Sequence, residues 1–361
     1  MKRLLAGMVA ALLAAVLVFP FRAEAISAQK AILYDGGSGR VLYEKNGYDR
    51  GLIASTTKIM TALVVCEQCN VLDRFRIPRE AVGIEGSSVY LREGEVWTVQ
   101  DLLYGLMLHS GNDAAVALAI FCGGTVEGFV GLMNDKAHRL GLKNTHFENP
   151  HGLDSKEHYS TAYDMAVLAD YAMENPIFRK TVSTQTISAG NRSLRNHNKL
   201  LWRLEGADGV KTGFTKSAGR ILVSSAMRQG RRLVAVTMNA PNDWQDHISL
   251  INDGFSRYRV QTIVTEGEVL GYAEVAGGEM GSVALVAAEG FSYPLAEGEI
   301  LELVLPHSGF VYAPVVQGEC AGYAYVCIGE KTAGKILIYF GQTIEQVKQE
   351  KRSFIEKFLG R

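Results

Sequence analysis

The chain has 361 residues, of which 47% are hydrophobic, and its formal net charge is −1. This length is sufficient for two domains and a substantial core. Nucleic-acid binding depends on a strongly basic surface, and the near-neutral charge gives no support for it. We therefore expect no nucleic-acid partner.

The first 25 residues have the three parts of a secretory signal peptide. Lys2 and Arg3 precede an apolar run over residues 4–19, and Ala23-Glu24-Ala25 provides small residues for cleavage. We predict a signal peptide over residues 1–25, cleaved after Ala25. An uncleaved membrane anchor is the alternative, although the apolar run is short for a membrane span. In both cases the globular part is expected to be exported.

Over about the next 240 residues, the sequence pattern predicts strands at both ends of the segment and helices between them. Two strand-like runs, 31–35 and 40–44, are joined by glycines and indicate a hairpin. Apolar spacing predicts helices starting near residues 55, 98, 112, 126 and 161, and three strands follow over 206–215, 220–227 and 231–238. The simplest arrangement is an α/β (α+β) fold in which helices cover one antiparallel sheet built from both ends of the domain.

From about residue 262 the pattern changes to short alternating runs between glycines, at 283–286, 300–305, 310–312, 323–326 and 335–340. This pattern predicts a small all-β domain. We therefore divide the mature chain into a first domain over 26–262 and a β domain over 263–341.

The tail over residues 342–361 returns to helical spacing. Ile344, Val347, Phe354 and Phe358 share one side, and cationic residues stand elsewhere. A basic amphipathic helix is typical of a segment that lies in a membrane interface. Lys351 interrupts the apolar stripe, so docking on the β domain is the alternative.

Five cysteines are an odd number, so at least one stays free if all pairing is internal. Cys66 and Cys69 have redox-motif spacing, but they come late in an apolar helix, where cysteine usually acts as a small apolar residue. Cys320 and Cys327 lie in a strand-rich region and could pair across two strands.

The sequence contains no metal-ligand motif, and we expect neither a metal nor a cofactor. Four histidines precede the last three strands of the first domain, and we interpret them as surface or loop residues: His138, His146, His151 and His158.

Ser55 and Lys58 stand three residues apart at the start of a predicted helix. Residues at this spacing share a helix face, so the serine hydroxyl and the lysine amine can meet. The positive end of the helix also favours a nucleophile there. Roughly one or two Ser-x-x-Lys matches are expected by chance in such a chain, and a second one occurs at Ser27 and Lys30.

Two further motifs make the set specific. Ser110-Gly111-Asn112 occupies a bend between two apolar helices, where helix capping is the simpler interpretation. Lys211-Thr212-Gly213 lies within a predicted strand. Each of these two patterns occurs once, and the order and setting of all three motifs are more informative than any one of them.

With these motifs the chain resembles serine-type D-Ala-D-Ala carboxypeptidases, which are low-molecular-mass penicillin-binding proteins related in fold to class A β-lactamases. The resemblance extends to the flanking residues 108–113 and 208–215. It implies a β-lactamase/transpeptidase-like fold, peptidoglycan stem peptides ending in D-Ala-D-Ala as substrates, and β-lactams as covalent inhibitors. It also implies attachment to the outer face of the cytoplasmic membrane through the C-terminal helix.

The chemistry of the motifs and the resemblance assign the same catalytic roles. Ser55 attacks the carbonyl of the penultimate D-alanine, which releases the terminal D-alanine and leaves an acyl-enzyme for water to hydrolyse. Lys58 accepts the proton if burial and the charge of Lys211 keep it neutral. Ser110 passes a proton to the leaving amine, and Asn112 orients Lys58 and the substrate amide.

The strand motif is expected to bind substrate. Lys211 and Thr212 suit the terminal carboxylate, and Gly213 leaves room for the substrate backbone. By analogy with the family, the backbone N–H groups of Ser55 and Phe214 form the oxyanion hole.

Three alternatives stay open. A class A-like β-lactamase needs a Glu-x-x-Leu-Asn motif for fast deacylation, which is absent, and it has Asp where this chain has Gly111. A non-catalytic penicillin sensor would have lost one of Ser55, Lys58 and Ser110, all of which are present. A transpeptidase differs only in the second nucleophile, which the sequence does not reveal.

Overall fold

A computed structural model describes residues 25–305 and 310–348. The chain forms two compact units. Unit 1 contains the residues up to Gly37 and Val41–Asp253, and unit 2 contains Ser38–Arg40 and the chain from Gly254 onward. The predicted signal peptide lies outside the described residues, apart from Ala25.

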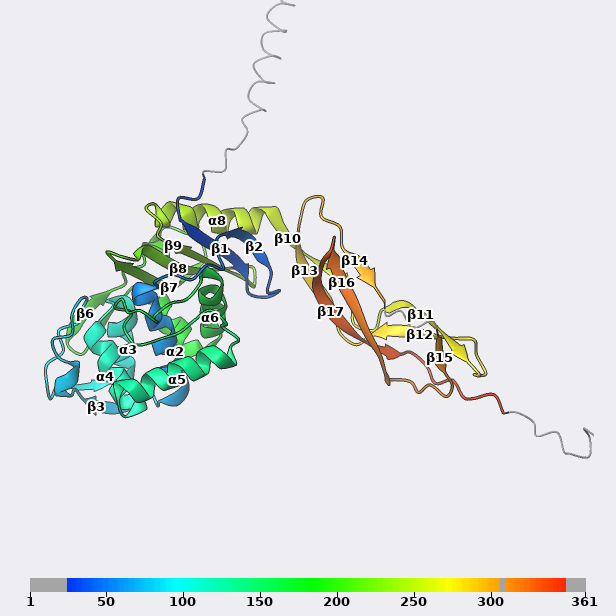
Figure 1. Ribbon diagram of the computed structural model, residues 1–361, viewed down its shortest axis with the longest axis horizontal. Helices are drawn as coiled ribbons and strands as arrows, with labels where there is room; N and C mark the ends of the chain where they lie inside the picture. Colours follow the sequence, from blue (N-terminus) through cyan, green and yellow to red (C-terminus); the bar gives the residue numbers. More distant parts are fainter. Residues whose placement is uncertain (1–24, 306–309, 349–361) are drawn as a thin grey trace, which may run out of the picture. The chain divides into compact units, whose positions relative to one another are not determined.

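Unit 1 is built on a five-stranded antiparallel sheet with the order β2-β1-β9-β8-β7 (Figure 1). Its strands are β1 (Lys30–Asp35), β2 (Val41–Lys45), β7 (Ala207–Thr215), β8 (Gly219–Arg228) and β9 (Arg231–Met238). The N-terminal hairpin therefore pairs with the last strand of the domain, which confirms the predicted sheet.

Five helices follow the predicted apolar spacing: α2 (Lys58–Gln68), α3 (Val99–Leu108), α4 (Asn112–Gly123), α5 (Val126–Arg139) and α6 (Ala162–Glu174). A short helix that we did not predict, α7 (Pro176–Ser183), follows α6. Thr98 and Thr161 cap α3 and α6 by accepting backbone hydrogen bonds from Asp101 and Asp164, as their spacing predicts. This helical group covers one face of the sheet, with α6 packed on β1 and β9.

A helix that we did not predict, α8 (Asp243–Arg257), lies along the other face (Figure 1). His247, a residue of this helix, is fully buried against the sheet and hydrogen-bonds to Ser224 on β8 and Thr237 on β9. The sheet is therefore covered on both faces, and its central strands β8 and β9 are buried on both sides.

Smaller elements complete unit 1. Two small antiparallel sheets of two strands each are formed by β3 (Arg74–Arg76) with β4 (Val96–Thr98) and by β5 (Thr186–Ala189) with β6 (Arg192–Arg195). Three short 3-10 helices are η1 (Ala54–Thr57), η2 (Arg79–Ala81) and η3 (Lys199–Trp202).

Unit 2 is all β apart from the end of α8, as the glycine-rich alternating pattern predicts. A six-stranded sheet has the order β14-β16-β17-β12-β11-β15, and β10 pairs with β13. The strands are β10 (Tyr258–Val264), β11 (Val269–Ala276), β12 (Ser282–Ala287), β13 (Phe291–Ala296), β14 (Glu302–Val304), β15 (Phe310–Tyr312), β16 (Cys320–Ile328) and β17 (Lys331–Phe340). Unit 2 begins before residue 262, because β10 belongs to it.

Two predictions about unit 2 need correction. Residues 342–348 are not helical: Ile344 is buried and bridges to Val315, so its apolar side chain completes the β core. The rest of the predicted tail helix, 349–361, lies outside the described residues. Cys320 and Cys327 stand on the same strand, β16, and are free thiols, so they do not pair across two strands.

Candidate active site

Ser55 lies in the short 3-10 helix η1, which leads directly into α2. The apolar residues of α2 hold this helix in the core, and Lys58 at its first position is completely buried. The predicted helix start is therefore found, with one tight turn in front of it. This turn presents the Ser55 side chain at the edge of the core.

The Lys58 amine has three oxygen partners. Lys58 Nζ lies 2.9 Å from Ser55 Oγ, 2.7 Å from Asn112 Oδ1 and 2.7 Å from the backbone oxygen of His151. Two of these partners come from the predicted motifs. The third comes from the turn over residues 149–153, whose backbone role could not be recognised from its sequence.

Burial sets the protonation of this amine. Complete burial lowers the pKa of Lys58 well below the ordinary lysine value, and the charge of Lys211 lowers it further, against an opposing effect of Asp113. Burial also lowers the pKa of Lys211 to about 7. Burial and the charge of Lys211 therefore both favour the neutral form of Lys58.

The bend between α3 and α4 positions the second motif. Ser110 adopts a left-handed backbone with φ of 61°, which turns the chain sharply between the helices. The Asn112 side chain donates to the Glu85 backbone oxygen at 2.5 Å, and its backbone N–H donates to Ser87 O. Asn112 is thus fixed on both sides of its contact with Lys58.

Asp113 orders the loop that faces this bend. Its carboxylate accepts hydrogen bonds from the Ser88 hydroxyl and from the backbone N–H groups of Val89 and Leu91. Asp113 is almost completely buried, so its charge is compensated by these donors. The loop residue Ser87 is thereby held beside the site.

Strand β7 passes close to Ser55. A Cβ atom on Gly213 would lie 3.2 Å from the Ser55 backbone nitrogen and 3.3 Å from Ile53 O. A larger residue there would require η1 or the strand to shift by a few tenths of an ångström. Next to it, Lys211 Nζ donates to the Thr212 backbone oxygen at 2.8 Å.

A cavity of about 330 Å³ opens at these motifs. Five of the predicted residues line it: Ser55, Ser110, Thr212, Gly213 and Phe214. The other three, Lys58, Asn112 and Lys211, are buried. The structure therefore brings all eight predicted residues to one place.

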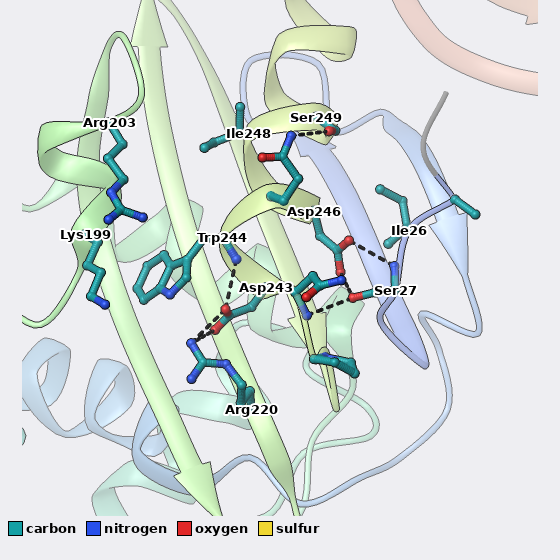
Figure 2. A pocket seen from close by; sticks show the side chains of 14 residues that line it. Ile26, Ser27, Lys199, Arg203, Arg220, Asp243, Trp244, Asp246, Ile248 and Ser249 are labelled. Atoms are coloured by element: carbon teal, nitrogen blue, oxygen red, sulfur yellow. Dashed lines mark hydrogen bonds and ion pairs between the residues drawn. The ribbon is translucent and has the colours of Figure 1, made fainter. Parts of the chain in front are cut away.

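The sequence analysis did not identify the outer wall of this cavity. Lys199, Arg220 and Trp244 line it together with His197 and Ser87. Figure 2 shows the Trp244 ring between Lys199 and Arg220, and the Arg220 guanidinium makes two hydrogen bonds to Asp243. Lys199, Arg220 and Trp244 come from η3, β8 and α8, and no local spacing in the sequence linked them to the motifs.

The same three side chains also border a neighbouring groove of about 680 Å³ (Figure 2). Lys199 Nζ lies 6.0 Å from the centre of the Trp244 ring, and Arg220 Cζ lies 5.9 Å from it. Both distances are at the limit for cation–π attraction. This wall therefore presents positive charge at the mouth of the Ser55 cavity.

The four histidines were interpreted as surface or loop residues, and His158 lies in a loop but is not at the surface. It is buried, and its Nε2 lies 2.7 Å from Thr57 Oγ1 in the turn that carries Ser55. Burial lowers the pKa of His158 to about 4, so its ring is neutral at neutral pH. His158 thus supports the nucleophile turn as an uncharged hydrogen-bonding partner.

No group of three or more His, Cys, Asp or Glu side chains suited to a metal ion occurs within residues 25–305 and 310–348. The site instead offers a hydroxyl, two buried amines and backbone amides. These groups suit acyl transfer through a serine.

Comparison with known proteins agrees with this arrangement. The family profile of D-alanyl-D-alanine carboxypeptidases matches residues 18–242, and the profile of the C-terminal domain of penicillin-binding protein 5 matches residues 258–346. The D-alanyl-D-alanine carboxypeptidase DacF of Bacillus subtilis is 34% identical over 311 residues, which are 82% of this chain and 80% of DacF.

Solved structures are similar as well. Penicillin-binding protein 5 of Haemophilus influenzae has a TM-score of 0.77 at 30% identity, covering 89% of this chain and 98% of its own. A DD-transpeptidase of Streptomyces K15 has a TM-score of 0.62 at 36% identity, covering 64% of this chain and 99% of its own. The resemblance noted from the motifs is confirmed, and the chain belongs to the serine-type D-alanyl-D-alanine carboxypeptidases, which cleave peptidoglycan peptides through an acyl-enzyme and bind β-lactams.

Proposed function

We propose that Ser55 is the nucleophile and Lys58 its base, and that the acyl-enzyme forms on Ser55 Oγ. The observation that supports this most directly is the 2.9 Å contact between Ser55 Oγ and the buried Lys58 Nζ. A neutral amine has two N–H groups and one lone pair. Asn112 Oδ1 and His151 O match the two N–H groups, which leaves the lone pair for the Ser55 proton.

Ser110 returns the proton in this proposal. It lines the same cavity as Ser55 and is held by the strained bend next to Asn112. A hydroxyl can accept and donate a proton at once, so Ser110 can pass one from Lys58 to the nitrogen of the departing D-alanine. Asn112 keeps Lys58 in place and binds the substrate amide.

Strand β7 supplies the oxyanion hole together with η1. The close approach of Gly213 to the Ser55 amide supports this, because it brings the next residue, Phe214, to the same side of the cavity. Two backbone N–H donors stabilise the developing oxyanion, each commonly worth about 3 kcal/mol.

The terminal carboxylate of the substrate binds to Lys211 and Thr212, with added attraction from the exposed wall. Lys211 has a pKa of about 7 in the free protein, and a bound carboxylate favours its charged form. Lys199 and Arg220 strengthen the positive potential at the cavity mouth. Asp243 offsets part of the Arg220 charge, so Lys199 contributes more.

The domain assignment extends this proposal to the whole chain. Unit 1 is the carboxypeptidase domain and unit 2 is the C-terminal β domain, with the boundary near Gly254 and not at the predicted residue 262. Residues 1–25 are removed on export. The tail after residue 348 attaches the enzyme to the outer face of the cytoplasmic membrane. No single helix among the described residues is long and apolar enough to cross a membrane.

Penicillin labelling followed by intact-mass measurement tests the nucleophile. The wild type should gain one penicilloyl group and retain it for much longer than one turnover of a peptide substrate takes. Ser55→Ala should gain none. Ser27→Ala, in the second Ser-x-x-Lys match, is the matched control and should label normally. Rapid loss of the adduct with release of hydrolysed penicillin would favour the β-lactamase alternative.

A further inference from the structure

The two helices that begin at Lys58 and Asn112 also meet at their other ends. Cys69 is the residue that ends α2, and Cys122 is the last but one residue of α4. The two helices pack against each other. Cys69 and Cys122 are both free and only partly buried, at the rim of the core.

The two thiols pack on the same hydrophobic core, at the ends of two helices that contact each other. The Cys122 thiol, as a hydrogen-bonding neighbour, lowers the pKa of Cys69. Nearby, the rings of Phe75 and Phe121 lie 5.1 Å apart, edge to face, which holds the chain after α2 against the end of α4. The sulfur atoms are thus positioned by packed elements on both sides.

We propose that Cys69 and Cys122 form a disulfide bond that joins the C-terminal ends of α2 and α4. At their N-terminal ends the same helices are already joined by the hydrogen bond between Lys58 and Asn112. The disulfide therefore joins the C-terminal ends of the same two helices whose N-terminal ends carry two of the three motifs. It is independent of the residue roles proposed above.

The neighbouring thiol Cys66 is a poor competitor. The spacing Cys66-x-x-Cys69 resembles a redox motif, but the Cys66 side chain faces the core and is 9% exposed. Burial raises the pKa of Cys66 to about 12, which keeps it a thiol. By contrast, the hydrogen bond from Cys122 lowers the pKa of Cys69, which favours its reactive thiolate.

The chemistry is thiol–disulfide exchange with an external disulfide, such as oxidised glutathione. The Cys69 thiolate attacks that disulfide, forms a mixed disulfide and releases one thiolate. The Cys122 sulfur, after losing its proton, then attacks Cys69 Sγ and releases the second thiolate. The two protein sulfurs lose two electrons to the external disulfide, and the two protons end on the released thiols.

Intact-mass measurement of the full chain tests the cross-link. After incubation with oxidised glutathione, the protein should lose about 2 Da, and non-reducing peptide mapping should connect Cys69 with Cys122. The closed loop contains roughly fifty residues, so the Tm of the oxidised protein should exceed that of the reduced protein by about 5–10 °C. D-alanine release should stay within about twofold.

Three variants make the test decisive. Cys69→Ser and Cys122→Ser should each show no 2 Da loss and no oxidation-dependent rise in Tm, whereas Cys66→Ala should keep both. The proposal is overturned if oxidation leaves glutathione on Cys69 without a link to Cys122. It is equally overturned if the mapped link joins Cys66 to Cys69.

Discussion

At the scale of single residues, the proposed activity depends on a lysine whose burial favours its neutral form. Lys58 is fully buried, and the charge of Lys211 acts on its amine. Both effects disfavour the ammonium form. In the proposed mechanism, the buried neutral amine of Lys58 therefore activates the Ser55 hydroxyl.

Lys211→Met should move the pH dependence of acylation. The rate of β-lactam acylation rises with pH as Lys58 loses its proton. Without the neighbouring charge the pKa of Lys58 is higher, so the rising limb should shift to higher pH. Stopped-flow acylation rates between pH 5 and 10 measure the shift, and an unmoved limb in a slower variant would limit Lys211 to substrate binding.

Gly213→Ala should slow acylation by about 10- to 100-fold, because a displaced β7 misplaces both the substrate and the Ser55 amide. Gly131→Ala is a suitable control, since a Cβ atom there meets nothing within 4 Å. Acylation rates and Tm should be measured for both variants. Wild-type acylation in Gly213→Ala would show that the close approach is unnecessary.

At the scale of elements, the sequence predicted the helices and strands whose apolar residues recur at a regular spacing. Apolar spacing located α2 to α6 and the strands β1, β2, β7, β8 and β9, because each pattern follows from one buried face. The three motifs located seven residues of the candidate site, and the resemblance to the family added Phe214. Each motif is a short run of neighbouring residues, so its spacing can be recognised in the sequence.

What the sequence missed depends on contacts between distant elements. The wall formed by Lys199, Arg220 and Trp244 joins three elements, and the backbone oxygen of His151 has no side-chain signal. In α8 the polar residues Asp243, Asp246 and His247 are buried and concealed the helix from an apolar pattern. Likewise, Ile344 looked like part of a helix face but completes a β core.

His247 makes the attachment of α8 sensitive to acid. Burial lowers its pKa to about 3, against about 6.5 in an unfolded chain, so stability is full above pH 6.5 and is lost as the pH falls. At pH 5 the loss is about 2 kcal/mol. His247→Gln cannot titrate and should lose less free energy of unfolding between pH 7 and pH 5, as denaturant titrations measure. An equal loss in both proteins would assign the acid sensitivity to other groups.

At the scale of the whole molecule, the catalytic unit is complete without the tail. Every residue of the proposed site lies before residue 253, in unit 1. A chain ending at residue 348 should therefore hydrolyse a soluble peptide at the wild-type rate but should no longer co-sediment with anionic vesicles. Vesicle binding that survives truncation would place the membrane contact elsewhere in the chain.

In the proposed mechanism, Ser55 is the single nucleophile for both peptide cleavage and acylation by β-lactams. The most direct measurement is D-alanine release from a peptide ending in D-Ala-D-Ala, made on the wild type, Ser55→Ala and Ser27→Ala, alongside the intact mass of each protein after penicillin treatment. We predict release and a stable adduct for the wild type and Ser27→Ala, and neither for a folded Ser55→Ala. A Ser55→Ala protein that retains one of the two activities would contradict the account.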